Sequence, residues 1–179
     1  MQSKISALLS PLDRFCARDE RSPPEAVQVD PSEIPQPYRK LLVHSNDMTP
    51  TLEKYHGARI YLEALTVLDQ PDAYAREVVL RLEGSGKPVE YGAILIFLDQ
   101  LDVPVQAEVR EARRPLGTLL EEYSQVRESH PSKYFRVVPD QTIQRIFGVN
   151  AGDAVYARKN RIVNKAGIDL AQVLEILPR

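Results

Sequence analysis

The sequence predicts an α+β domain, an antiparallel β-sheet with helices packed on one face. Segments rich in Val, Ile, Leu and Tyr follow one another with only short turns between them, whereas a parallel sheet would alternate such segments with helices. Near the end of the chain, two further apolar segments flank an Asn-Lys-Ala-Gly turn, as expected for a β-hairpin. The strands therefore outnumber the helices and come in runs.

The composition is that of an ordinary globular protein. The 179 residues, 43% of them hydrophobic, predict one domain over residues 1–179 with a sizeable core. The 25 acidic and 23 basic side chains give a net charge of −2, which argues against a nucleic-acid partner. No basic amphipathic segment or long apolar run indicates a membrane partner. The single cysteine, Cys16, and the lack of a secretory-signal pattern predict a cytoplasmic protein.

The first 36 residues predict a helix followed by an extended connector. Apolar residues recur at helical spacing over residues 3–16, although Pro11 weakens the second half of that helix. Residues 17–36 combine several prolines with many charges, which is typical of an extended segment on the surface.

Two helices and a three-stranded meander are expected next. One helix covers residues 37–45, and a second begins at Thr49-Pro50, because Thr is a good N-cap and Pro a good first helical residue. Gly57 is a natural C-terminal end for this second helix. Three consecutive strands joined by short turns are predicted over residues 58–69, 74–84 and 88–99.

The remainder of the chain mixes helices and strands. Residues 106–125 have a helical pattern, which Pro115 and Gly117 divide so that a helix restarts near Leu116. The last predicted elements are a strand over residues 133–139, a helix over 140–148 and the closing hairpin.

Arg76 is the candidate ligand-binding residue that the strand pattern singles out. Period-2 alternation places it with Val78 on the apolar face of the strand over residues 74–84. The opposite face, which carries Glu77 and Arg81, is mostly polar. A buried guanidinium needs an anionic or acceptor partner, and its planar fork suits a carboxylate. Arg76 therefore holds a carboxylate ligand, pairs with a buried Asp or Glu, or reaches water from the strand end.

Glu175 is the candidate acid–base residue. It lies in the last predicted strand between apolar neighbours on both sides, so we expect it to be at least partly buried. Burial disfavours the charged form of a carboxyl, which makes Glu175 a candidate proton donor or acceptor. The alternative is an ion pair with Arg76 or Arg158 and no chemistry.

Two predicted helix starts complete the candidate site, and other types of site are not indicated. The segment over residues 44–53 and the break at Pro115-Leu116-Gly117 each lead into a helix start, where free backbone N–H groups bind an anion or are simply capped. Three histidines without HxxH or HExxH spacing and one cysteine predict no metal. No GxSxG, Walker A or GxGxxG motif indicates a nucleophile elbow or a nucleotide cofactor.

Four stretches, in order, carry a resemblance to a known family. They are LLVHSNDMTPTLEKYHG (41–57), YAREVVLRLEGSGKPVEYGAILI (74–96), RPLGTLL (114–120) and VYARKNRIVNKAGIDLAQVLEILP (155–178). In these stretches the chain resembles the chorismate–pyruvate lyases, most closely their chorismate lyase-like branch. Together the stretches span residues 41–178, most of the chain.

The resemblance implies a fold, a reaction and roles for four residues. The family converts chorismate to 4-hydroxybenzoate and pyruvate without a metal or cofactor, in a pocket closed by flaps over an antiparallel sheet. By this resemblance, Arg76 would bind the ring carboxylate, assisted by the backbone at Leu116. Glu175 and the backbone at Met48 would contact the ring oxygen at the opposite end. An enzyme of this kind mainly orients the substrate and stabilises charge on the departing group.

One departure from the family concerns the second carboxylate of chorismate. Classical members have a second arginine directly after the Gly of the third strand, where this chain has Ala93 after Gly92. By strand parity, Arg81 faces away from Arg76. The candidate replacement cations are Arg81, Arg158 and Arg161.

Three functions are therefore open. The first is a chorismate lyase that makes 4-hydroxybenzoate for ubiquinone or other aromatic-acid biosynthesis. The second is a non-catalytic domain that binds a small aromatic acid, because the same fold serves as the effector-sensing domain of some bacterial transcription regulators. The third is an enzyme acting on another enolpyruvyl or aromatic acid. All three expect a small-molecule partner.

Overall fold

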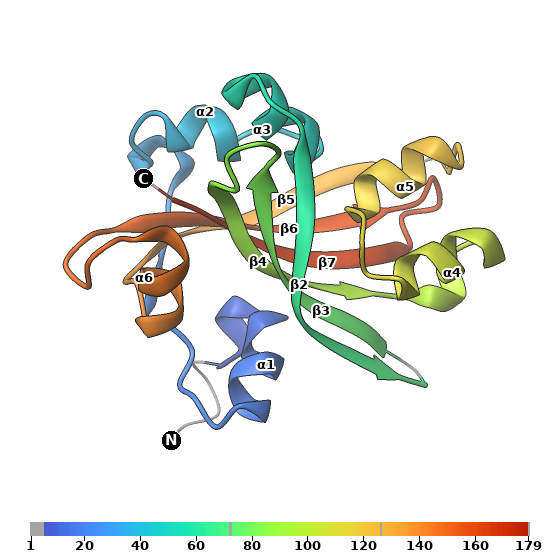
Figure 1. Ribbon diagram of the computed structural model, residues 1–179, viewed down its shortest axis with the longest axis horizontal. Helices are drawn as coiled ribbons and strands as arrows, with labels where there is room; N and C mark the ends of the chain where they lie inside the picture. Colours follow the sequence, from blue (N-terminus) through green and yellow to red (C-terminus); the bar gives the residue numbers. More distant parts are fainter. Residues whose placement is uncertain (1–5, 72, 126, 179) are drawn as a thin grey trace.

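The computed structural model describes residues 6–71, 73–125 and 127–178 and is built on one seven-stranded sheet (Figure 1). The strand order is β1-β5-β6-β7-β4-β3-β2, and every neighbouring pair is antiparallel. The strands are β1 (Ala26–Val29), β2 (Ile60–Gln70), β3 (Ala73–Leu82), β4 (Pro88–Ile96), β5 (Glu128–Val137), β6 (Val155–Val163) and β7 (Asp169–Leu177). The prediction of an α+β fold with an antiparallel sheet is confirmed.

The meander β2-β3-β4 and the closing hairpin β6-β7 lie where the sequence predicts strands. Two differences concern the other strands. The predicted connector over residues 17–36 contains β1, which pairs with β5 at the edge of the sheet, so this segment is not wholly extended surface chain. β5 begins at Glu128, five residues before the predicted start, and a bulge at Pro131 accommodates the proline within the strand.

The helices agree with the predicted segments more closely than with the predicted ends. α3 has Asp47 rather than Thr49 at its N-cap and ends at Gly57, which has the left-handed φ of 65° that favours glycine. The predicted helix over residues 3–16 is divided near Pro11 into two shorter pieces; its first residues lie outside the described part. The helices are η1 (Ser6–Leu9), α1 (Leu12–Arg18), η2 (Pro31–Glu33), α2 (Tyr38–Leu42), α3 (Met48–His56), η3 (Leu98–Gln100), α4 (Val103–Arg110), α5 (Leu116–Glu122) and α6 (Gln141–Phe147).

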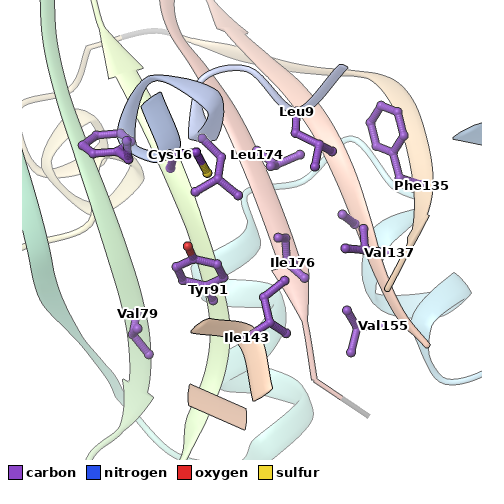
Figure 2. Close-up of a cluster of buried hydrophobic side chains, with 14 of the residues drawn as sticks. Leu9, Cys16, Val79, Tyr91, Phe135, Val137, Ile143, Val155, Leu174 and Ile176 are labelled. Atoms are coloured by element: carbon purple, nitrogen blue, oxygen red, sulfur yellow. The ribbon is translucent and has the colours of Figure 1, made fainter. Parts of the chain in front are cut away.

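Helices cover both faces of the sheet, not one as the sequence predicts. On the first face, α1 and α6 pack over the middle strands in a buried cluster. In Figure 2, Tyr91 of β4 and Leu174 of β7 lie on the same side of the sheet as Cys16. On the second face, α2 and α3 pack on one part of the sheet and α4 and α5 on another. Part of the predicted polar face of β3 is accordingly buried too, and Glu77 is only 3% exposed.

Polar partners inside the first face explain how Glu77 tolerates burial. The Tyr91 hydroxyl donates a hydrogen bond to Glu77 Oε1 at 2.5 Å, and Arg21 Nη2 reaches the same oxygen at 2.5 Å. The Cys16 thiol also lies in this face and accepts a hydrogen bond from Arg21. Burial raises the pKa of Cys16 to about 11, so this thiol stays protonated and unreactive. We therefore infer that the buried polar groups on the first face of the sheet stabilise the fold.

Gly92 lies where the backbones of β4 and β7 approach closely. A Cβ at this position would be 2.0 Å from the carbonyl oxygen of Leu174. Because the obstacle is backbone in the centre of the sheet, it cannot move without disturbing the β4–β7 pairing. We expect Gly92→Ala to lower the free energy of unfolding by about 2–3 kcal/mol, as overpacking in a core does, measured by urea denaturation.

Gly152 provides the matched control for this prediction. It lies in a turn outside the strands, and a Cβ there would meet no atom within 4 Å. Gly152→Ala is therefore expected to leave the urea midpoint close to that of the unmodified protein. Equal midpoints for the two variants would contradict a close backbone approach at Gly92.

Candidate functional site

A cavity of about 70 Å³ lies between the second face of the sheet and the helices that cover it. This volume is well above the ~10–15 Å³ that one water molecule needs on the same measure, so a small ligand fits better than a single water. β2, β3, β4, β6 and β7 form the floor, and the starts of α3 and α5 form the roof. Apolar side chains line most of it, including Leu62, Val78, Leu80, Ile94, Ile162 and Val173.

The strand register orders the polar residues of the floor into three rows. Arg76 of β3 lies opposite Ile94, which lies opposite Val173, which lies opposite Asn160 of β6. In the next row, Glu175 of β7 lies between Arg158 of β6 and Gly92 of β4. In the third row, Glu90 of β4 lies opposite Leu80 of β3. Successive rows are two residues, or about 7 Å, apart.

Arg76 is buried in this floor without an acidic partner. Its side chain is 1% exposed, as its position on the apolar face predicts. Nη2 donates to the carbonyl oxygen of Arg114 at 2.8 Å, but Nε and Nη1 have no hydrogen-bond partner among the described residues. Burial lowers the pKa of the guanidinium. No salt bridge links Arg76 to an acidic side chain among the described residues, and its burial leaves it no exit to water.

Glu175 is buried and paired with Arg158, the cross-strand neighbour that the sequence named as one alternative. Arg158 donates from Nε to Glu175 Oε2, and its Nη2 lies 3.4 Å from Oε1. The same guanidinium donates to the carbonyl oxygens of His44 at 2.9 Å and Asn46 at 3.2 Å. Arg158 thus holds both Glu175 and the loop that leads into α3.

Glu90 is the site residue that the sequence analysis missed. Its side chain lines the cavity, is 5% exposed, and leaves Oε2 without a hydrogen-bond partner among the described residues. Burial raises the pKa of Glu90 well above its usual value of 4.5; the neighbouring Glu175 raises it further, and Arg158 lowers it. The cavity therefore contains a carboxyl that is proton-bound at a higher pH than an exposed glutamate. The available signal was a lone acid in the apolar run PVEYGAILI, two residues from Gly92.

Unsatisfied buried polar atoms concentrate at this cavity. Arg76 Nε and Nη1, Glu90 Oε2 and Asn160 Oδ1 have no hydrogen-bond partner among the described residues, although Asn160 donates to Ser129 Oγ at 2.8 Å. All three residues line the cavity. Native proteins leave few buried polar atoms unpaired, and such atoms usually belong to groups that meet water or a ligand. The cavity is therefore the candidate functional site.

Met48 and Leu116 lie at the starts of α3 and α5, on the roof of the cavity. The N–H groups in the first turn of any helix have no acceptor within that helix. Asp47, which precedes Met48, accepts a hydrogen bond from Arg127 Nε at 3.1 Å, and this bond fixes the start of α3. The structure thus brings all four residues, Arg76, Glu175, Met48 and Leu116, around one cavity.

None of the three candidate cations for a second carboxylate is free. Arg158 binds Glu175, Arg81 binds Glu63, and Arg161 binds Asp169. None of these three arginines is among the residues that line the cavity. Ala93 packs in the cluster under α1, on the face opposite to that of Arg76. Within the described part of the chain, Arg76 is the one basic side chain that lines the cavity, and it has no acidic partner.

Neither a metal site nor a membrane-spanning helix is found among the described residues. No group of three or more His, Cys, Asp or Glu side chains is placed to hold a metal ion in that part of the chain. No helix there has the length and apolar character needed to cross a membrane.

The raised pKa of Glu90 predicts a pH-dependent stability. A carboxyl whose pKa is higher in the folded state binds its proton more tightly there, so its contribution is complete below pH 4.5 and is lost as the pH rises through the folded-state value. Glu90→Gln keeps the shape and cannot ionise. We expect the melting temperature of this variant to exceed that of the unmodified protein by a margin that grows with pH, measured by calorimetry from about pH 5 to 8.

The control for this pH series is Glu83→Gln, because Glu83 is exposed at the turn after β3. Its pH profile should follow that of the unmodified protein. A constant margin for Glu90→Gln at every pH would contradict a buried, proton-bound Glu90.

Comparisons with known proteins identify relatives by fold alone. No protein-family model and no curated protein matches the chain. Among solved structures, PhnF from Mycobacterium smegmatis is 12% identical with a TM-score of 0.59, over 97% of this chain and 94% of that one. The effector domain of PhnF is 12% identical with a TM-score of 0.57, over 74% and 88%. The product SA0254 of Staphylococcus aureus is 7% identical with a TM-score of 0.54, over 75% and 89%.

These likenesses define the class of fold. The seven-stranded antiparallel sheet with its covering helices is the chorismate lyase-like α+β fold that such effector domains share. At 12% identity or less, these similarities indicate a shared fold and do not indicate which ligand this chain binds.

Proposed function

We propose that this chain is a small-molecule-binding domain that holds a carboxylic acid on Arg76 and does not convert it. One observation carries the proposal: a fully buried guanidinium lines a cavity and lacks an acidic partner among the described residues. Leaving such a group unpaired costs several kcal/mol, and a bound carboxylate removes that cost through a bidentate contact. The fold it shares with the effector domain of PhnF supports binding as the role of this cavity.

The chorismate lyase alternative needs more than the cavity offers. Chorismate carries two carboxylates, and Arg76 can neutralise one. The other would enter a cavity whose remaining ionisable side chains are acidic or already paired, among them Glu90, Glu175 and Asp47. The Arg158 contact also occupies Glu175, the residue that the resemblance assigns to the ring oxygen. Both features favour binding of a monocarboxylate over turnover of chorismate.

The test compares acids with isosteric amides. We expect benzoate and 4-hydroxybenzoate to raise the melting temperature in proportion to the logarithm of their concentration, because a ligand that binds only the folded state stabilises it by mass action. Benzamide and 4-hydroxybenzamide, which lack the carboxylate, should give no shift. Binding constants then follow from isothermal titration calorimetry.

A parallel incubation with chorismate separates binding from catalysis. At high protein concentration, we expect no 4-hydroxybenzoate or pyruvate above the spontaneous background. Product formation that depends on the protein would show that the chain is a lyase. Equal binding of acids and amides would show that Arg76 does not hold the carboxylate.

A further inference from the structure

We infer that Glu90 makes the cavity selective for monocarboxylates that carry a hydrogen-bond donor, a hydroxyl or an amine, at the end remote from the carboxylate. The same residue would exclude dicarboxylates. The inference rests on the proposed function, because it assumes that the carboxylate of the ligand lies on Arg76.

Three acceptor-bearing side chains form an arc across the cavity floor. Asn160 on β6, Glu175 on β7 and Glu90 on β4 lie on successive strands, each displaced by one row from the next. Glu90 Oε2 and Asn160 Oδ1 have no donor among the described residues. Diagonal neighbours of this kind are about 7–8 Å apart, so one small group lying between Glu90 and Glu175 can reach both.

Arg76 lies across the floor from this arc, on β3. Glu175 is two strands and one row away from it, so the two Cα atoms are roughly 12 Å apart at about 4.8 Å per strand and 7 Å per row. Both side chains rise from the same face of the sheet, and the cavity fills the gap between these two positions. Ile94 and Val173 lie beneath that gap and provide an apolar surface for the body of the ligand.

The charges around the arc decide which group the far end accepts. Glu175 is neutralised by Arg158, and no further free cation lines this end within the described residues. An ionised Glu90 repels an anionic group outright. A protonated Glu90 has a single O–H to donate and keeps its other oxygen as an acceptor, beside the carboxylate of Glu175. In both states the arc offers more acceptors than donors and no net positive charge, which favours a donor and opposes a second carboxylate.

Four para-substituted benzoates of similar size test the inference. 4-Hydroxybenzoate and 4-aminobenzoate carry the donor, 4-methylbenzoate fills the same volume without one, and terephthalate carries a second carboxylate. We expect both donor-bearing acids to bind the unmodified protein at least about tenfold more tightly than 4-methylbenzoate, and terephthalate to bind most weakly. The ratio between the hydroxyl and amine compounds shows which donor the site prefers.

Glu90→Gln links this selectivity to the residue. The amide removes the acidic group and adds two N–H donors, so we expect terephthalate to gain about tenfold or more in affinity relative to 4-hydroxybenzoate. Glu83→Gln, on an exposed turn, should leave every ratio unchanged. Melting curves of both variants confirm that each is folded.

The outcomes separate this inference from the proposed function. If none of the four acids binds, the proposed function fails. If they bind with equal affinities, or if Glu90→Gln leaves the terephthalate ratio unchanged, the carboxylate site stands and the role of Glu90 is overturned.

Discussion

Arg76→Met should raise the stability of the ligand-free protein and strongly weaken its binding of carboxylates. Both effects have one cause, because the guanidinium is buried with two unpaired donors and no acidic partner among the described residues. Methionine fills a similar elongated volume with no charge to desolvate. Replacing buried charges by apolar side chains commonly stabilises a protein by about 1–4 kcal/mol, and we expect a gain of this order in calorimetry.

The same substitution removes the partner of the ligand carboxylate. Truncating one side of a buried, hydrogen-bonded charge pair costs about 2–5 kcal/mol, so the Kd of 4-hydroxybenzoate should rise by at least about 30-fold. Calorimetric titration measures this directly. A structural arginine behaves in the opposite way, because its removal lowers stability and changes ligand affinity only indirectly.

Arg81→Met is the matched control on the same strand. Arg81 faces away from the cavity and binds Glu63 and the carbonyl oxygen of Gly86. We expect Arg81→Met to leave the Kd of 4-hydroxybenzoate unchanged and to give no increase in the stability of the ligand-free protein. A destabilised Arg76→Met variant, or one that keeps its affinity, would show that Arg76 is held by the fold and not by a ligand.

The position of Arg76 could be predicted from alternation alone, whereas its lack of a partner could not. The alternation of side chains along a strand predicts which of them lie on the same face. β3 keeps this alternation without interruption from Tyr74 to Leu80. Whether an acid lies opposite depends on residues of β4, β6 and β7, which are distant in sequence and are joined only by the sheet register. Glu90 entered the site in this way, through its pairing with Leu80 across the β3–β4 hairpin.

The same reasoning explains the errors in the fold. β1 has four residues and lies among prolines, so its stability comes from pairing with a strand about a hundred residues later and not from local pattern. The second layer of helices was signalled by β4, whose apolar run is typical of a strand buried on both faces. Glu77 obscured that signal, because a polar residue with a buried partner looks like a surface residue in the sequence.

Arg158→Met is expected to have the largest cost in stability. The guanidinium holds the buried Glu175 and three backbone carbonyl oxygens, those of Leu42, His44 and Asn46. Its removal leaves a carboxylate and these acceptors without their donor. Breaking a buried pair from one side costs about 3–5 kcal/mol, measured here by urea denaturation.

Two further variants distinguish the effect of losing the Arg158–Glu175 ion pair from the effect of any arginine substitution on β6. Arg161 lies three residues along β6 and makes a solvent-exposed pair with Asp169, so Arg161→Met should change the urea midpoint little. In the double variant Arg158→Met with Glu175→Leu, neither position leaves an unpaired charge, and we expect much of the lost stability to return. The loop into α3 would still lack its anchor, so ligand affinity should stay low while the fold recovers. Equal stabilities for Arg158→Met and Arg161→Met would contradict this role, because an arginine that orients the cavity must cost more to lose than one on the surface.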